Sequence, residues 1–445
     1  MSSVRPAAVA GMFYPVDARR LAAELDDLLG AAAEPSPRLG YPKALVVPHA
    51  GYIYSGPVAA RAYDELVPAR GLVKRVVLLG PTHRVAVRGL AASSASAFAT
   101  PLGAVRIDAE AFARVRDLPQ VVVSDAAHAL EHSLEVQLPF LQKMLGDFAL
   151  APFAVGMASV REVAEVLERL WGGPETLIVI STDLSHYHSY EEARAIDGAT
   201  IERIARFATD LEHDEACGAT PLNGLLATAK AKRLGVKLLS ACNSGDTAGD
   251  KGRVVGYSAF ALYEISQDEA GRTLLAIARG AIEAKLTGRA SELRSAPWLE
   301  QPAATFVTLL KNGELRGCIG SLERLRALTD DVAQNALGAA FRDPRFPPVS
   351  ADEWPQCRVE VSLLSTPQPI HFAGEAELGA QLRAGEDGVI LEADGKRATF
   401  LPQVWDEVRD PRAFLAQLVR KAGLPAETPL SRCTVSRYRV VKWKE

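Results

Sequence analysis

The chain has 445 residues, of which 48% are hydrophobic and 23% charged, a composition typical of a globular protein with about two or three domains. Its net charge of −4 argues against a nucleic-acid-binding surface as the main feature. The sequence contains neither the run of about 18 apolar residues that predicts a transmembrane helix nor the N-terminal pattern of a signal peptide. Five cysteines without CxxC spacing indicate a reducing compartment, so a cytoplasmic protein is expected.

Up to residue 264, short apolar runs typical of buried strands alternate with runs of helical spacing. Strands are expected at residues 44–49, 76–83, 105–108, 121–124, 148–155, 177–183, 236–242 and 254–263. Helices are expected at residues 17–29, 55–66, 134–141, 160–170, 191–207 and 221–234. This alternation predicts an α/β domain with a largely parallel sheet and helices on both of its faces.

After residue 264 the pattern changes. A helix is expected at residues 268–286, and Asn312-Gly313 predicts a tight hairpin between two strands. A helix at residues 328–341 and further hairpin-like strands follow, which together predict an α+β domain. We place the domain boundary near Ser266, which gives domains at residues 1–266 and 267–445.

Four of the predicted strands end in residue types that bind metals. These are His49, His83, the pair Asp183 and His186, and Cys242. Ligands of open α/β sheets bind at the carboxyl ends of the strands, so these side chains are expected to border one crevice. The alternative is that the histidines are buried structural residues and that Cys242 belongs to the core.

Three further side chains are candidates for proton transfer. His132 lies in a segment dense in ionisable residues and can carry a proton at neutral pH; alternatively, it is a helix-surface histidine paired with Glu135. Asp183 and His186 can orient a metal-bound water or act as acid and base. The alternative is that Asp183 caps a helix and that His186 is a packed side chain.

The first half of the chain resembles the Memo family, whose fold is similar to that of the class III extradiol dioxygenases. The resemblance covers nearly all of residues 4–264 and depends on the segments 48–56, 80–83, 131–137 and 181–187 and on the strand that ends at Cys242. The second half resembles the AMMECR family through the segments 315–320 (LRGCIG), 343–347 (DPRFP) and 399–405 (TFLPQVW). These families resemble components B and A of the AmmeMemoRadiSam system, which implies a radical SAM protein as a partner.

The Memo resemblance implies a metal held by His49, His83 and Cys242. Imidazole and thiolate ligands favour iron or copper and also suit zinc. The extradiol enzymes hold Fe(II) with two histidines and a carboxylate, so a cysteine in the third place departs from their pattern and argues against ring-cleaving dioxygenation.

Arg316 and Cys318 form a second candidate site, in the second domain. An arginine beside a cysteine can make the thiol reactive, and the flanking glycines would let a ligand approach the backbone. The alternative is a tight strand bend with Cys318 in the core. The only histidine in this half is His371, so a Cys–His nucleophile is poorly supported.

These observations lead to three hypotheses for function. The leading one is a metal-dependent redox enzyme component, either O2-activating or an oxidoreductase, that works with a radical SAM partner on a small-molecule or peptide substrate. The first alternative is a scaffold that binds a ligand or peptide without catalysis. The second is a zinc-dependent hydrolase in which Asp183 or His132 activates water.

Overall fold

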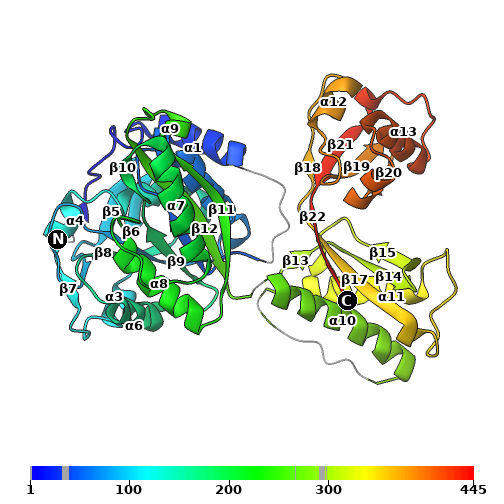
Figure 1. Ribbon diagram of the computed structural model, residues 1–445, viewed down its shortest axis with the longest axis horizontal. Coiled ribbons are helices and arrows are strands. Elements are labelled where there is room, and N and C mark those ends of the chain that lie inside the picture. Colours follow the sequence, from blue (N-terminus) through cyan, green and yellow to red (C-terminus); the bar gives the residue numbers. More distant parts are fainter. Residues whose placement is uncertain (1–2, 33–39, 266, 290–295, 297) are drawn as a thin grey trace. The chain divides into compact units, whose positions relative to one another are not determined.

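The computed structural model describes residues 3–32, 40–265, 267–289, 296 and 298–445. The chain forms two compact units, the first built from residues up to 265 and the second from residues beyond 266 (Figure 1). Ser266, the expected boundary, itself lies outside the described residues. Each unit has hydrophobic clusters of its own.

The central sheet of the first unit contains nine strands within the described residues, in the order β10-β12-β2-β9-β3-β8-β4-β7, with β11 also paired to β12. Its middle strands β2, β9, β3 and β8 run parallel, whereas β10, β11 and β12 pair antiparallel at one side. The bounds are β2 (Ala44–Val47), β3 (Arg75–Pro81), β4 (Leu90–Ala92), β7 (Val121–Val123), β8 (Ala149–Val155), β9 (Thr176–Ser181), β10 (His186–His188), β11 (Gly235–Asn243) and β12 (Val254–Tyr263). The first unit is therefore a mixed α/β structure with a mostly parallel central sheet.

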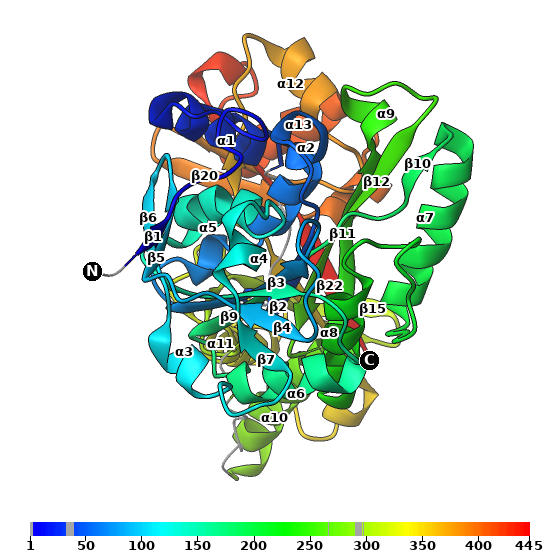
Figure 2. The same cartoon turned by 90° about the vertical axis from the view of Figure 1, so that its left-hand side faces the viewer.

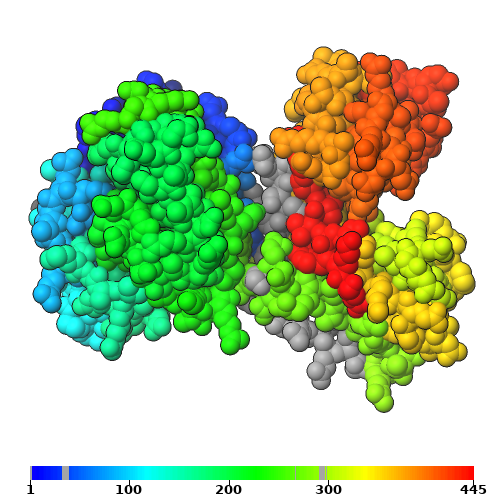
Figure 3. Space-filling model, in the orientation of Figure 1, coloured from blue at the N-terminus to red at the C-terminus, as the bar shows by residue number. Residues whose placement is uncertain are grey.

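Helices cover both faces of this sheet (Figure 2). One face packs against α1 (Ala18–Ala32), α2 (Tyr52–Asp64) and α5 (Leu138–Leu145). The other packs against α3 (Ala109–Ala113), α6 (Val160–Leu170), α7 (Tyr190–Ala205) and α8 (Ala219–Ala231). In the space-filling view, α7 and α8 form much of the green surface of this second face (Figure 3). Leu45 and Val47 enter the first cluster and Ala44 and Val46 the second, because successive side chains of a strand point to opposite faces.

The remaining elements of the first unit are short. Three strands form a separate small sheet: β1 (Val4–Arg5), β5 (Ala97–Thr100) and β6 (Gly103–Arg106). The short helices are η1 (Val67–Ala69), α4 (Asp125–Ala129), η2 (Glu135–Gln137) and α9 (Ser244–Thr247).

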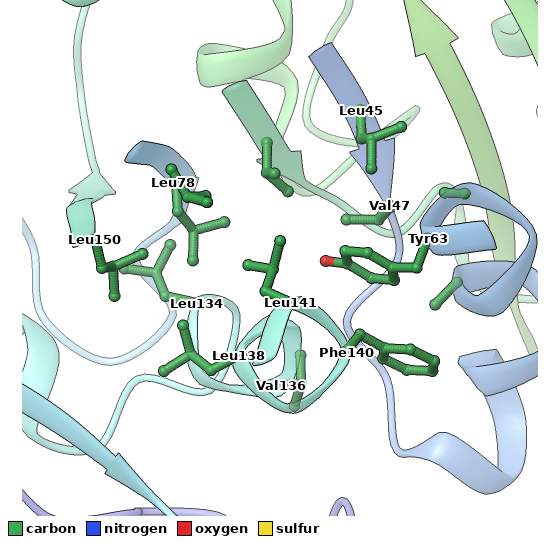
Figure 4. Close-up of a cluster of buried hydrophobic side chains, with 14 of the residues drawn as sticks. Leu45, Val47, Tyr63, Leu78, Leu134, Val136, Leu138, Phe140, Leu141 and Leu150 are labelled. Carbon is green, nitrogen blue, oxygen red and sulfur yellow. The ribbon is translucent and has the colours of Figure 1, made fainter. Parts of the chain in front are cut away.

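The segment before α5 is less helical than its spacing predicts. Leu134, Leu138 and Leu141 all belong to the buried cluster that contains Leu78 of β3 (Figure 4). However, α5 begins only at Leu138, after the single turn η2, and residues 131–134 form no helix. The backbone N–H groups of residues 132 and 133 donate to the Glu131 carboxylate instead, which favours a turn over a helix.

The second unit contains two four-stranded antiparallel sheets in its described residues. One has the order β15-β14-β17-β22, with β14 (Thr305–Lys311), β15 (Glu314–Gly320), β17 (Cys357–Leu364) and β22 (Val440–Lys444). The other has the order β18-β21-β19-β20, with β18 (Gln368–Pro369), β19 (Gly388–Ala393), β20 (Lys396–Phe400) and β21 (Thr434–Tyr438). The short pair is β13 (Pro302–Ala303) with β16 (Arg326–Ala327), and the helices are α10 (Gln267–Thr287), α11 (Leu328–Phe341), η3 (Trp354–Gln356), α12 (Glu375–Gln381), η4 (Pro402–Asp406), α13 (Pro411–Lys421) and η5 (Leu430–Arg432).

The hairpin predicted at Asn312-Gly313 is present between β14 and β15, and both of its residues have positive φ, 51° and 85°. Across the described residues of both units, no helix combines the length and apolar character needed to cross a bilayer.

Candidate metal centre

Three imidazoles meet at the carboxyl edge of the central sheet. His49 follows β2 and His83 follows β3, while His132 lies in the turn before η2. One nitrogen of each ring lies within 4.8 Å of the other two. The ring centroids of His83 and His132 are 4.6 Å apart, and that of His49 lies 5.1 and 5.4 Å from them. The structure therefore brings His49, His83 and His132 into one cluster.

Hydrogen bonds assign the protonation of His49. Ser181 donates its hydroxyl proton to the carbonyl of Ser133 at 2.6 Å and accepts from Gln137 at 2.8 Å. His49 Nδ1, at 2.9 Å from the Ser181 oxygen, must therefore carry the proton and donate it. Burial, and then the neighbouring His83, hold the pKa of His49 well below its usual range. The ring is neutral, and its Nε2 keeps a lone pair for a metal or a proton.

The Glu131 carboxylate, which no sequence pattern marks as part of the site, positions the other two histidines. One oxygen accepts from His83 Nδ1 and from the backbone N–H groups of His132 and Ser133, each at 2.9 Å. The other accepts the backbone N–H of His83 at 2.7 Å. Burial alone would raise the pKa of Glu131, but its hydrogen bonds with His83 lower it to about 2. The carboxylate thus fixes His83 with Nδ1 occupied and Nε2 free, the usual arrangement behind a metal-binding histidine.

Cys217 is the cysteine that contacts this cluster. Its Sγ lies 3.3 Å from His49 Nε2 and accepts the backbone N–H of Asp183 at 3.3 Å. Burial, and then the Asp183 carboxylate, raise the pKa of the thiol to about 12. No local pattern in the sequence marks Cys217, because it lies in a loop before α8 and not at the end of an apolar run.

Cys242 does not join the imidazoles, contrary to the ligand set expected from the sequence. Its strand, β11, does end at the same edge of the sheet, but the side chain faces the helices of the first face. It lines a separate pocket with Leu28 of α1 and Arg61 of α2 and packs against the hydrophobic core of that face. A residue at the end of a suitable strand can therefore lie at the expected edge of the sheet and still line a different pocket.

Asp183 and His186 lie where the sequence placed them, close to the cluster. Asp183 accepts the backbone N–H of His49 at 2.7 Å, and its other oxygen is 3.9 Å from His49 Nε2. Burial raises the pKa of this carboxyl. Asp183 does not cap a helix, since it lies between β9 and β10. His186 is fixed by its Nδ1, which donates to the carbonyl of Leu184 at 2.8 Å.

The cluster opens into a cavity of about 920 Å³. Its lining includes His83, Cys217, His186 and His188 together with apolar residues such as Val155 and Met157. The volume lies within the range of pockets that hold small molecules.

The second candidate site does not take the form expected from the sequence. Arg316 binds the Glu353 carboxylate with two nitrogens, at 2.7 and 2.9 Å, and the carbonyl of Pro347 at 2.8 Å. Cys318 Sγ accepts from the hydroxyl of Thr308 at 3.3 Å. Arg316 therefore anchors the loop that carries Pro347 and Glu353. Cys318 has Thr308, and not Arg316, as the hydrogen-bond partner of its sulfur.

The glycines flanking Cys318 serve internal packing. A Cβ at Gly317 would lie 2.2 Å from the carbonyl oxygen of Ala339 in α11, and one at Gly320 would lie 2.2 Å from the ring of Phe306. Their lack of a side chain lets α11 and an aromatic ring approach β15, which accounts for both glycines without a ligand.

Comparisons with known proteins cover both halves of the chain. Residues 5–261 match the family model described as Memo-like protein, and residues 275–443 match the model AMMECR1. A MEMO1 family protein of Aquifex aeolicus is 39% identical over 269 residues, covering 57% of this chain and 97% of that protein. One of Ignicoccus hospitalis is 37% identical over 286 residues, covering 58% and 97%.

Among solved structures, that of an uncharacterized protein from Pyrococcus horikoshii is 33% identical, with a TM-score of 0.37, and the match covers 39% of this chain and 91% of that one. The two family models confirm both resemblances: the chain belongs to the Memo family and joins its Memo-like domain to an AMMECR1 domain.

Proposed function

We propose that this protein is a metal-dependent redox enzyme component whose metal is held by His49, His83 and Cys217. The contact that carries the proposal is the 3.3 Å between Cys217 Sγ and His49 Nε2. Two ligands of one tetrahedral metal, at about 2.0 Å for nitrogen and about 2.3 Å for sulfur, lie about 3.5 Å apart. The sulfur of Cys217 and the Nε2 of His49 therefore fit a shared ion once the thiol loses its proton, and His83 Nε2 belongs to the same group of close donors as His49.

The hydrogen bonds around the cluster support this assignment. Ser181 and Glu131 each occupy the Nδ1 of one histidine, which leaves both Nε2 atoms available. When bound, iron or copper would supply redox chemistry and zinc only Lewis acidity, and the nitrogen–sulfur set accommodates all three.

Three side chains are placed to move protons beside the metal. His132 Nδ1 lies 3.4 Å from Glu131, and burial lowers the pKa of this imidazole, so it is neutral and can accept a proton at neutral pH. Asp183 lies against His49, and His186 lines the cavity. We assign proton transfer to these three residues.

The domain fusion supports a role in a larger system. We propose a fold like that of the extradiol dioxygenases for the Memo-like unit and a radical SAM protein as partner. The AMMECR1 unit would bind substrate or this partner, and the covalent link raises the effective concentration of one domain at the other. The five cysteines are free thiols, which supports a reducing, cytoplasmic compartment.

Elemental analysis of anaerobically purified protein tests the proposal. The wild type and Cys242→Ser should hold near-stoichiometric iron or copper, and His49→Ala and Cys217→Ser should lose it. Zinc alone would favour the hydrolase. No metal after reconstitution with each ion would favour the non-catalytic scaffold. Loss of metal in Cys242→Ser but not in Cys217→Ser would show that the ligand set is wrong.

A further inference from the structure

Cys318 of β15 lies opposite a hydroxyl group that donates to its sulfur. It pairs with Thr308 across the sheet, and the Thr308 hydroxyl oxygen lies 3.3 Å from Cys318 Sγ. A hydrogen bond to the charged form of a side chain favours that form, so this donor supports a thiolate. Cys318 is partly exposed, which a thiol needs in order to react with a molecule from solution.

The Arg345 guanidinium lies beside Cys318. Its Nη2 donates to the Cys318 carbonyl oxygen at 3.3 Å, and the side chain is 54% exposed. Arg345 also binds the Asp343 carboxylate, at 2.9 Å through Nε and 2.7 Å through Nη2, and Asp343 accepts the backbone N–H of Cys318 at 2.8 Å. This carboxylate therefore holds the guanidinium close to the cysteine and offsets its charge.

Lys421, the last residue of α13, adds a cation whose charge is not offset. Burial, and then the Arg345 guanidinium, lower the pKa of this ammonium, whereas the Cys318 sulfur raises it, so the three groups are electrostatic neighbours. Lys421 Nζ donates to the Thr399 carbonyl at 3.0 Å and lies 4.8 Å from the Phe400 ring centroid. Among the described residues of this unit no carboxylate pairs with Lys421, so these groups together give the surroundings of Cys318 a net positive charge.

The other four cysteines of the chain have different surroundings. Burial is the main cause that raises the pKa of each of these thiols, to about 12 for Cys217 and about 11 for Cys242, and it raises the pKa of Cys357 and Cys433 as well. The attacking form of a cysteine is the thiolate, so these four thiols are poorly reactive at neutral pH. Reaction with a small molecule is therefore expected first at Cys318.

The groups around Cys318 suit exchange with a disulfide. This reaction requires a thiolate that the reagent can reach, and the Thr308 hydroxyl supports the thiolate. The net positive charge from Lys421 attracts a reagent that carries carboxylates and repels one that carries ammonium groups. The charge of the site therefore selects an anionic disulfide over a cationic one.

We propose that Cys318 is a modification site that forms a reversible mixed disulfide with a small disulfide carrying carboxylates, and that Lys421 recognises the negative charge of this reagent. The Cys318 thiolate attacks one sulfur of the reagent, and the new S–S bond forms as the S–S bond of the reagent breaks. The leaving thiolate keeps the electron pair and takes a proton from water. The inference does not rest on the proposed function, because all of its groups belong to the second unit.

Incubation of the full chain with oxidised glutathione, and in parallel with cystamine, tests the proposal. The first reagent is anionic and the second is cationic, and both are small disulfides. Intact-protein mass spectrometry measures the rate of addition, and peptide mapping identifies the modified residue. The first adduct of oxidised glutathione should form at Cys318, and Cys318→Ser should form none over the same time. Addition that begins at any of the other four cysteines would overturn the proposal.

Lys421→Met tests the recognition of charge. The quantity compared is the rate constant at Cys318 for oxidised glutathione divided by that for cystamine, so that the intrinsic reactivities of the two reagents cancel between variants. Loss of the ammonium should lower this ratio about 3- to 10-fold, and Lys421→Arg should keep it. The matched control is Lys396→Met, because the Lys396 ammonium also donates to a backbone carbonyl, that of Gly423. A ratio that falls equally in Lys396→Met, or does not fall in Lys421→Met, would refute the role of Lys421.

Salt tests the same attraction in the wild type, without dependence on how a variant folds. Raising the ionic strength from about 0.01 M to about 1 M shortens the screening length from about 30 Å to about 3 Å. The ratio of the two rate constants should therefore fall toward the value of Lys421→Met. A ratio that does not change with salt would show that charge does not select the reagent.

Discussion

At the scale of single residues, two buried carboxylates near the histidine cluster have separate roles. Glu131 is 2% exposed and Glu135 is not exposed at all, yet they serve different partners. Glu131 holds His83 and the turn of His132, whereas Glu135 accepts from Arg5 and Tyr14, each at 2.6 Å. Glu131 therefore positions the histidines of the candidate metal centre, whereas Glu135 anchors the N-terminal segment.

We predict that Glu131→Gln weakens metal binding about 10- to 100-fold, because the amide no longer accepts both the imidazole and the backbone protons with full charge. Competition with a chelator of known affinity measures this change. Glu135→Gln is the matched control, which should lower the melting temperature and leave metal affinity within about threefold. Equal metal affinity in the wild type and in Glu131→Gln would show that Glu131 does not support metal binding.

At the scale of elements, the loop after α11 is bound to the edge strand β15. Arg316 donates to Glu353, and the backbone N–H of Cys318 donates to Asp343 at 2.8 Å. Two of the three segments that carry the AMMECR resemblance, 315–320 and 343–347, thus meet in space along the edge strand β15. Covering such an edge prevents pairing with other chains.

This contact predicts an acid dependence of stability. The hydrogen bonds from Arg316 lower the pKa of Glu353 from 4.5 to about 2. The carboxyl therefore stabilises the folded second unit above pH 4.5, and this contribution is lost as the pH falls toward 2. The free energy of unfolding, measured in urea, should fall between pH 5 and 2 in the wild type. It should fall less over the same range in Glu353→Gln, because this variant has no carboxyl to protonate at that position.

At neutral pH we expect Glu353→Gln to cost about 3 kcal/mol, because it leaves the buried Arg316 without its carboxylate. The control is Glu323→Gln, whose partner Arg397 binds a carboxylate that is 60% exposed, so its cost should stay below about 1 kcal/mol. Similar costs for the two variants would show that the buried pair adds no special stability.

The approach of α11 to β15 gives a second prediction at this scale. Gly317→Ala would place a methyl group 2.2 Å from the Ala339 carbonyl oxygen and force the helix away from the strand. We expect a loss of about 1–3 kcal/mol in the free energy of unfolding. Gly374→Ala meets no atom within 4 Å and should be close to neutral. Equal stability of these two variants would refute the packing role of Gly317.

At the scale of the whole molecule, every residue of the candidate centre comes from the first unit. We therefore expect a fragment of residues 1–266 to bind metal with the affinity of the full chain. Calorimetry on both proteins, with circular dichroism to confirm folding, measures this. A folded fragment whose affinity is more than tenfold weaker would show that the second unit contributes to the centre.

The sequence by itself determined the features that local patterns encode. Buried strands that end in His49 and His83 predicted an edge of the sheet rich in metal ligands, and the structure brings both imidazoles together there. Asn312-Gly313 predicted its hairpin, because few residue pairs tolerate two positive φ angles. The family of each half followed from short motifs in the same way.

Only the tertiary structure decided which side chains meet. Cys217 does not end an apolar run, and Cys242 ends a suitable strand but lines a separate pocket, so no local pattern identifies which of the two meets the imidazoles. Glu131 and Arg316 likewise take their roles from partners distant in sequence, Glu131 from His83 and Arg316 from Glu353. The spacing of apolar residues encodes which side chains are buried. Which pocket a side chain lines, and which partner it meets, depend on strand register and on packing between segments that are distant in sequence.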